Sequence, residues 1–288
     1  MTPLHSLLSE QKDLYHAYFG SGPVVLRQAV SVEGLPTSAE INALLDGGML
    51  KYPYFTLFQE GVKPPLAELT TSRRINGQDV AGFANPVGVR KHLAEGATIR
   101  MSDIEDWHPL TRRQVDELRE TFPADVKTLM FLTPVGKRGL LPHRDGSRTI
   151  VIQLEGAKEW HLYWSEETDS ADAGLGVDPD TEIDSFVLRP GDVMFMPHGY
   201  GHACTATGEM SLHLTFLLYE PTPQDLVAAF AKEWISTARM STHGADHHTL
   251  SPSDKVDTII ADLQKFSHEI DADRLLDRAL AMLADKDE

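Results

Sequence analysis

The chain has 288 residues, of which 41% are hydrophobic and 8% aromatic, so it can bury a substantial core in one main domain with a small appendage. Its formal net charge of -17 argues against nucleic-acid binding, since a phosphate backbone is met by an excess of Lys and Arg. No apolar run is long enough for a membrane span, and the N-terminus lacks the regions of a signal peptide. The single cysteine, Cys204, excludes an internal disulfide. Together these features predict a cytoplasmic protein.

Short helices and one strand are predicted in the N-terminal third. Ser9–Tyr18 and Ser38–Leu45 show partial helical spacing, and Val24–Leu26 is a short strand candidate. Thr111–Glu120 has the pattern of a helix that leads into the next run of strands.

A polar segment interrupts these elements. Leu66–Gly88 contains Thr-Thr-Ser-Arg-Arg and several turn residues, so we expect a loop region near the mouth of the β domain. Within it, Arg73 and Arg74 could contact an acidic group of a substrate, although a solvated charge pair is the commoner reason for such a dipeptide.

Strands separated by turn residues dominate the middle of the chain. Thr149–Leu154 is rich in β-branched residues, Lys158–Tyr163 alternates, and the turn residues Glu155-Gly-Ala157 between them predict a hairpin. Strands at such short spacing predict an antiparallel barrel or jelly roll, whose mouth can hold one metal and one ligand. The further predicted strands are Thr128–Pro134, Phe186–Leu188, Val193–Met196 and Ser211–Leu218, with a turn at Arg189–Asp192.

After Pro221 the pattern changes to helices. They are predicted at Asp225–Arg239, at Ser251–Phe266 with Ser251 or Ser253 as N-cap, and at Ala272–Ala284. The polar joint of residues 241–248 indicates a linker rather than a metal site, although it contains two adjacent histidines. We therefore divide the chain into a main domain of residues 1–220 and a helical appendage of residues 221–288.

Two segments supply candidate metal ligands. His143 and Asp145 are two residues apart, so on an extended segment both side chains point to the same side. A distant histidine, His198 or His202, follows in the glycine-punctuated loop Met196-Pro-His-Gly-Tyr-Gly-His202. Two histidines and one carboxylate can hold Fe(II) and leave coordination positions open for chemistry.

The order of these motifs resembles a known family. His143-Arg-Asp145, Gly156-Ala-Lys-Glu-Trp160, Arg189 to His202 and Ser211-Leu-His-Leu-Thr-Phe216 are similar to motifs of the Jumonji-C (cupin-type) oxygenases, in particular the ribosomal-oxygenase branch. The resemblance runs to about Tyr219, roughly three quarters of the chain. It implies a double-stranded β-helix (jelly roll) core with helical flanks, Fe(II), 2-oxoglutarate as co-substrate, and hydroxylation of a C–H bond with release of succinate and CO2.

The resemblance also implies roles for single residues. His143 and Asp145 match the first two iron ligands, and His202 matches the third, because the family pattern places that ligand after the Gly-x-Gly turn and not at His198. Lys158 matches the basic residue that binds the distal carboxylate of 2-oxoglutarate. A cation there is physically sensible, since a carboxylate that enters an apolar barrel needs a charge partner.

Other positions near the motifs are less specific. The resemblance suggests that the hydroxyl of Thr215 helps to hold 2-oxoglutarate and that His213 lines the pocket outside the metal shell. Leu129 and Phe131 stand where relatives often carry Asn and Tyr, which puts some hydrogen bonds to the co-substrate in doubt. For Cys204 a small buried residue is favoured over a metal ligand.

The substrate is the least constrained prediction. The family implies a protein or peptide side chain, and the acidic chain would suit a basic polypeptide, although acidity for solubility is the stronger explanation. The alternatives are a free amino acid or small natural product, a cupin that needs no keto acid, and a non-catalytic metal-binding cupin module. In similar oxygenases the C-terminal helices support dimerisation or a winged-helix appendage, so a homodimer is one option.

Overall fold

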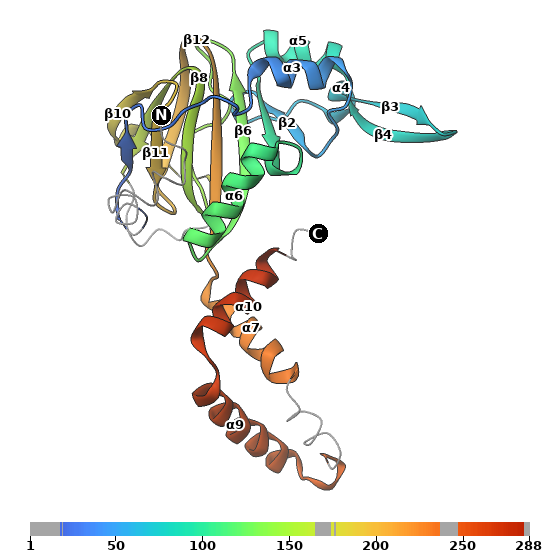
Figure 1. The fold of residues 1–288 in the computed structure, drawn as a ribbon, viewed down its shortest axis with the longest axis vertical. Helices are drawn as coiled ribbons and strands as arrows, with labels where there is room; N and C mark the ends of the chain where they lie inside the picture. The colour runs from blue at the N-terminus through green and yellow to red at the C-terminus, as the bar shows by residue number, and fades with distance from the viewer. Residues whose placement is uncertain (1–17, 19, 165–173, 176, 237–246, 285–288) are drawn as a thin grey trace. The chain divides into compact units, whose positions relative to one another are not determined.

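The computed structural model describes residues 18, 20–164, 174–175, 177–236 and 247–284 (Figure 1). The chain forms two compact units. The first contains the residues up to Thr121 together with Val126–Tyr219, and the second contains Phe122–Asp125 with the residues from Glu220 onward. No helix of the described residues is long and apolar enough to cross a membrane.

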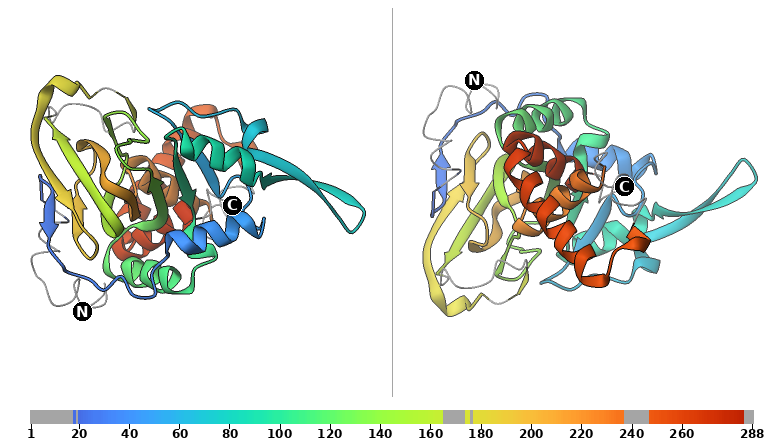
Figure 2. Two further views of the ribbon diagram at one scale, coloured as in Figure 1. Left: turned by 90° about the horizontal axis from the view of Figure 1, so that it is seen from above. Right: turned by 90° about the horizontal axis from the view of Figure 1, so that it is seen from below.

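A large antiparallel sheet forms the core of the first unit. Its main path runs in the order β1-β11-β8-β12-β6-β5-β2, while β10 pairs with β8, β7 with β12, and β9 with β7. Figures 1 and 2 show the long strands β8 and β12 side by side at the centre. The jelly-roll fold predicted from the spacing of the strands is confirmed. The strands are β1 (Val24–Leu26), β2 (Phe55–Phe58), β5 (Thr98–Ser102), β6 (Asp125–Thr133), β7 (His143–Arg144), β8 (Arg148–Tyr163), β9 (Gly174–Leu175), β10 (Glu182–Leu188), β11 (Val193–Met196) and β12 (Gly201–Tyr219).

The predicted hairpin between residues 149 and 163 is wrong, because these residues form the single strand β8. Strand β12 pairs with both halves of β8, from Tyr163 opposite Gly201 to Arg148 opposite Leu218, with a shift of register between Thr207 and Leu212. Gly156 has a φ of +61°, and a Cβ there would lie 2.0 Å from the carbonyl oxygen of Met210. The glycine therefore allows a close approach of two backbones at an irregular point of the ladder, and it does not reverse the chain.

The other edge of β8 is covered by two successive strands. β10 pairs with the second half of β8, and β11 pairs with its first half. The turn Arg189-Pro-Gly-Asp192 joins them, as its sequence predicts.

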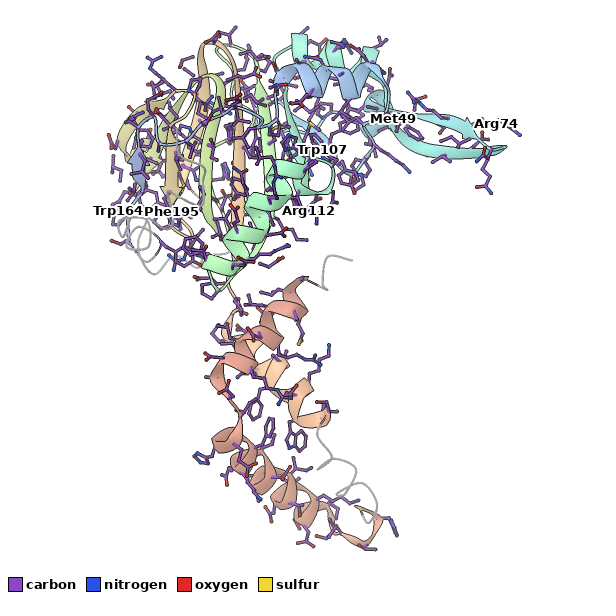
Figure 3. The ribbon with its side chains drawn as sticks, in the orientation of Figure 1. Met49, Arg74, Trp107, Arg112, Trp164 and Phe195 are labelled. Carbon is purple, nitrogen blue, oxygen red and sulfur yellow. The ribbon has the colours of Figure 1, made fainter. Side chains whose placement is uncertain are left out.

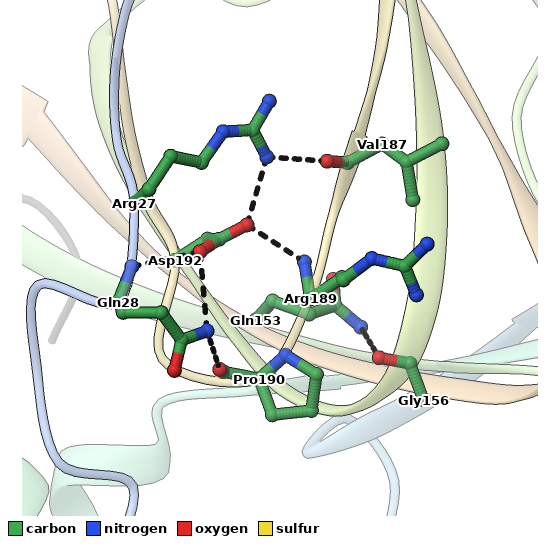
Figure 4. Close-up of polar contacts among 8 residues, drawn as sticks. All are labelled: Arg27, Gln28, Gln153, Gly156, Val187, Arg189, Pro190 and Asp192. Carbon is green, nitrogen blue, oxygen red and sulfur yellow. Dashed lines mark hydrogen bonds and ion pairs between the residues drawn. The ribbon is translucent and has the colours of Figure 1, made fainter.

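The carboxylate of Asp192 ties this turn to the N-terminal strand (Figure 4). It accepts hydrogen bonds from the backbone N–H of Gln28 at 2.8 Å, from the backbone N–H of Arg189 at 3.0 Å and from the guanidinium of Arg27 at 2.8 Å. Burial alone would raise the pKa of Asp192, but these hydrogen bonds and the charge of Arg27 outweigh it and lower the pKa below its ordinary value.

Replacing Asp192 with Asn is expected to lower the free energy of unfolding by about 2 kcal/mol at pH 7, because charge-assisted hydrogen bonds to a buried acceptor are lost. The folded-state pKa is depressed, so this stabilisation is present above the unfolded-state pKa and is lost as the pH falls through the folded-state pKa. Urea titrations of both proteins at pH 7 and at about pH 3 measure this difference. A difference that stays constant over that range would contradict the assignment.

Helices and a separate hairpin flank the sheet. The helices are α3 (Ser38–Asp46), α4 (Leu66–Leu69), α5 (Pro86–Ala94) and α6 (Pro109–Thr121), with the short 3-10 helix η1 (Ile104–Asp106) before α6. Thr37 and Glu40 form a capping box at the start of α3, which explains why this helix begins at Ser38. The predicted helix at Ser9–Tyr18 lies outside the described residues apart from Tyr18.

The predicted loop at Leu66–Gly88 is wrong, since most of it forms the two-stranded sheet β3 (Thr70–Ile75) and β4 (Gln78–Ala84). Asn76 and Gly77 occupy its two-residue turn with φ values of 48° and 82°, as expected for a type I′ hairpin. The strands carry polar residues on both faces, so the apolar alternation that usually reveals a strand is missing.

The second unit contains the three helices predicted after Pro221. They are α7 (Pro223–Ser236), α9 (Pro252–Glu269) and α10 (Ala272–Ala284), and a 3-10 turn η3 (His247–Thr249) precedes α9. Ser251 is the N-cap of α9, one of the two predicted capping residues. The rings of Phe230 and Phe266 pack edge to face, and the indole N–H of Trp234 donates to Asp262 at 2.7 Å. The rest of the helix predicted to end at Arg239, and most of the joint that follows, lie outside the described residues.

Candidate metal and co-substrate site

A cavity of about 610 Å³ lies within the first unit, in the size range of small-molecule sites. Its wall combines β2, β5, β6, β7, β8 and β12 with the loop before β7. The side chains that line it include Lys63, Arg100, Leu129, Phe131, His143, Asp145, Lys158, Trp160, His202, Cys204, His213 and Thr215.

His143, Asp145 and His202 meet at this cavity. Pairing of β7 with the start of β12 places His143 opposite His202, although 59 positions of sequence separate them. The Nε2 atoms of His143 and His202 lie 3.7 and 3.6 Å from the two carboxylate oxygens of Asp145. One ligand atom from each residue lies within 4.8 Å of the other two, a spacing that suits a single metal ion.

Backbone carbonyls orient both imidazole rings. The Nδ1 of His143 lies 2.8 Å from the carbonyl oxygen of Leu141, and the Nδ1 of His202 lies 3.0 Å from that of Tyr200. Because a carbonyl can only accept, Nδ1 is the donor in each ring, and in the neutral tautomer this leaves the electron pair of Nε2 available to a metal. This is the arrangement found around metal-bound histidines, whose second nitrogen donates to an outer partner.

Burial also favours the neutral form of His202. Only 6% of its side chain is exposed, and this burial, together with the charge of His143, lowers the pKa of His202 despite the neighbouring Asp145. The neutral imidazole is the form that binds a metal. The competing candidate, His198, is exposed and does not belong to the cluster.

Lys158 lies in the same cavity as a buried cation. Its Nζ atom donates to the hydroxyl of Thr133 at 3.0 Å and lies 3.2 Å from Nδ1 of His213. Burial lowers the pKa of Lys158, and burial together with the charge of Lys158 lowers the pKa of His213 well below its ordinary value, so His213 is the neutral acceptor. No carboxylate forms an ion pair with Lys158 among the described residues, and a buried cation without a counter-ion is costly. The position therefore suits an anionic ligand.

The remaining predicted positions also lie at the cavity wall. Thr215 is buried and lines the cavity, and Leu129 and Phe131, both in β6, line it as well. Cys204 lines the cavity without belonging to the metal cluster, and His213 stacks on Phe131 with ring centroids 4.9 Å apart.

Two contributors were not predicted from the sequence. Thr133 holds Lys158 and is itself bound by the hydroxyl of Thr98 at 3.2 Å. It could have been found, because Thr133 follows Leu129 and Phe131 in the alternation of one strand face. For Arg100 the sequence predicts no role, and the pairing of β5 with β6 places it at the cavity. The arginines Arg73 and Arg74 do not line the cavity; Arg74 lies near the tip of the hairpin (Figure 3).

The residues present fit a divalent metal and a keto acid. Two neutral imidazoles and one carboxylate on one side of a cavity form the donor set of mononuclear non-haem iron sites, and three protein ligands leave positions open. The buried Lys158 shares the cavity with them and offers a charge partner for a carboxylate.

Comparison with known proteins identifies the family of this region. Residues 105–226 match the JmjC domain family. A bifunctional lysine-specific demethylase and histidyl-hydroxylase NO66 from Dictyostelium discoideum is 26% identical over 217 residues, which cover 72% of this chain and 40% of that protein. The chain thus spans less than half the length of this curated relative.

Solved structures show the same fold. The structure of Escherichia coli ycfD aligns with a TM-score of 0.58 at 18% identity, covering 91% of this chain and 68% of that chain. The structure of the ribosomal oxygenase YcfD with cobalt and 2-oxoglutarate aligns with a TM-score of 0.52 at 17% identity, covering 84% and 62% of the two chains. The resemblance inferred from the motifs is confirmed: residues 105–226 match the JmjC domain, and the similar proteins include a histidyl-hydroxylase NO66 and, in fold, a ribosomal oxygenase. The predicted enzyme class, a 2-oxoglutarate-dependent dioxygenase, and the predicted cofactors, Fe(II) and 2-oxoglutarate, agree with this family match.

Proposed function

We propose that this JmjC-domain chain is an Fe(II)- and 2-oxoglutarate-dependent hydroxylase of a protein or peptide side chain. His143, Asp145 and His202 would hold the iron, and Lys158 would bind the distal carboxylate of 2-oxoglutarate. The observation that carries the proposal is a buried lysine, without a carboxylate partner among the described residues, in the same cavity as a metal-type His-Asp-His cluster.

Each residue of the site has a defined task in this proposal. The carbonyls of Leu141 and Tyr200 fix Nδ1 as the donor of each ring and aim the Nε2 atoms of the two histidines at the position of a metal. Thr133 and the neutral His213 fix the ammonium of Lys158, which limits the entropy lost when a carboxylate arrives. The bound metal would activate O2, the oxidant that hydroxylates the C–H bond while 2-oxoglutarate is oxidised to succinate and CO2, and the protein supplies orientation and shelter from water.

The names of the relatives support a protein substrate. The similar Dictyostelium discoideum protein is named a lysine-specific demethylase and histidyl-hydroxylase, and the similar Escherichia coli structure is that of a ribosomal oxygenase. We propose the same class of substrate here, a side chain of a polypeptide, in preference to a free amino acid or small natural product.

The test is incubation of the purified chain with Fe(II), ascorbate, 2-oxoglutarate and a cell lysate from which small molecules have been removed. Succinate should form in step with the addition of one oxygen atom to a peptide in the lysate, detected by mass spectrometry. Succinate formation only with the small-molecule fraction would overturn the assignment of a protein substrate. No succinate with either fraction, and no colour change when 2-oxoglutarate is added to the anaerobic Fe(II) protein, would indicate a non-catalytic cupin module.

A further inference from the structure

We propose that Arg100, assisted by Lys63, makes this cavity selective for polypeptides in which an Asp or Glu residue lies next to the reacting residue. This inference rests on the proposed hydroxylase function and names the substrate class that the cavity would accept. It assigns Arg100 as a specificity residue.

Arg100 is placed at the cavity by the sheet. It lies in β5, opposite Thr56 of β2 and Phe131 of β6, and its guanidinium carbon lies 5.2 Å from the centre of the Phe58 ring. Its Nε atom is buried and has no hydrogen-bond partner. A donor in this state is unfavourable, so the native site offers an unused hydrogen bond.

No fixed anion neutralises Arg100. The residue forms no ion pair among the described residues, and Asp103 and Tyr219 act on its charge only from a distance. Burial lowers the pKa of Arg100, which shows that its environment disfavours the charge, yet an arginine keeps its proton. A ligand with a negative charge would remove this cost.

A second cation lies beside the same aromatic ring. Lys63 is exposed at the rim of the cavity, and its Nζ atom lies 5.4 Å from the centre of the Phe58 ring. Both cations line the cavity that contains the metal-type cluster. Two positive side chains around one ring form a local positive patch on a chain whose net charge is -17.

The charges of the proposed cofactors leave this patch uncompensated. Asp145 is the only carboxylate among the cavity-lining residues of the described chain. The two carboxylates of 2-oxoglutarate would offset Lys158 and the net charge of a divalent metal bound to Asp145. Arg144 also lines the cavity but takes part in other interactions. Arg100 and Lys63 then remain without a counter-charge, and the substrate is the component that can supply one.

A carboxylate is the group that fits best. A guanidinium presents parallel N–H donors that match the two oxygens of a carboxylate, and partial burial strengthens such a contact. The same cations would repel a Lys or Arg side chain at this position. The overall acidity of the chain favours a basic polypeptide at long range, but the local charge at the cavity favours an acidic residue next to the reacting one.

A peptide-binding experiment tests this assignment without turnover. The full chain is loaded with Zn(II), which has no redox chemistry, and with 2-oxoglutarate, and it is then incubated with a random octapeptide pool. Bound peptides are sequenced by mass spectrometry. We expect Asp and Glu to be enriched about tenfold over Asn and Gln at one position, the effect of a charge-assisted hydrogen bond in a partly buried site.

Matched variants assign the enrichment to Arg100. Arg100→Gln should abolish it, Arg100→Lys should retain part of it, and the exposed Lys63→Gln should reduce it about twofold. Arg74→Gln, at the exposed hairpin, should leave it unchanged. Thermal unfolding of each variant shows whether it folds. If Arg100→Gln does not fold, Lys63→Gln tests the charge of the patch and Arg100→Lys tests the guanidinium geometry.

The outcomes separate this inference from the proposed function. Enrichment of Lys or Arg, no enrichment, or an acidic preference that persists in folded Arg100→Gln would overturn the role of Arg100. If free L-glutamate displaces the acidic peptides fully at equal concentration, the carboxylate is recognised outside a polypeptide, which overturns the peptide part of the proposal. Succinate formation by the Fe(II) protein is measured separately, so an active chain without acidic preference leaves the proposed function standing.

Discussion

Replacing His202 with Ala is expected to lower succinate formation by on the order of a hundredfold or more, since even loss of a partner outside the metal shell commonly costs 10- to 100-fold. The side chain supplies one of three ligand atoms that lie within 4.8 Å of one another, and two ligands alone would hold a metal poorly. The measurement combines the iron content of the protein after dialysis with the rate of succinate formation at saturating Fe(II) and 2-oxoglutarate.

His198 provides the matched control. It lies four positions earlier in the same glycine-punctuated loop, but its side chain is exposed and outside the cluster. His198→Ala should therefore retain both iron and succinate formation. If His198→Ala lost the metal while His202→Ala kept it, the ligand set drawn from the structure would be wrong.

The choice between His198 and His202 shows which metal ligands could be predicted from the sequence. His143 and Asp145 are neighbours in the chain, so an alternation rule is enough to place both side chains on one side of a strand. The third ligand could be assigned only from the family resemblance, because the sequence alone does not distinguish His198 from His202 in the same loop. The pairing of His143 with His202 across β7 and β12 supplies the physical reason for the choice.

The errors in the predicted fold have a common cause. Gly156 and its neighbours have the composition of a turn, yet the chain continues through them because β12 runs antiparallel along the whole of β8. The hairpin of β3 and β4 was missed because the apolar residues of its strands do not alternate with polar ones. In both cases the pairing of the backbones outweighed local composition.

The same limit applies to the cavity. Lys158 could be predicted because a motif marks it, whereas Arg100 is one arginine in a short strand and its place depends on the register of β5 against β6. Specificity residues of this kind are set by tertiary structure, and this is why the substrate could not be predicted beyond its class. Whether the cavity holds the co-substrate as proposed is therefore best tested at Lys158.

Replacing Lys158 with Met is expected to weaken 2-oxoglutarate binding without lowering the free energy of unfolding. Loss of the charge partner should weaken 2-oxoglutarate binding by on the order of a hundredfold, the usual effect of removing one member of a buried ion pair. The free energy of unfolding of the ligand-free protein should stay the same or rise by about 1–2 kcal/mol, because Lys158 is only 2% exposed and lacks a carboxylate partner.

Binding of 2-oxoglutarate to the Zn(II) protein by calorimetry and unfolding in urea measure the two effects. Lys158→Arg keeps a cation and should recover part of the affinity, while Lys265→Met, on the exposed surface of α9, should change neither quantity. A lysine with a purely structural role would give the reverse pattern, in which Lys158→Met unfolds more easily and still binds 2-oxoglutarate. The tethers to Thr133 and His213 then would serve the fold, and the anchor for the keto acid would have to be another cation of the cavity.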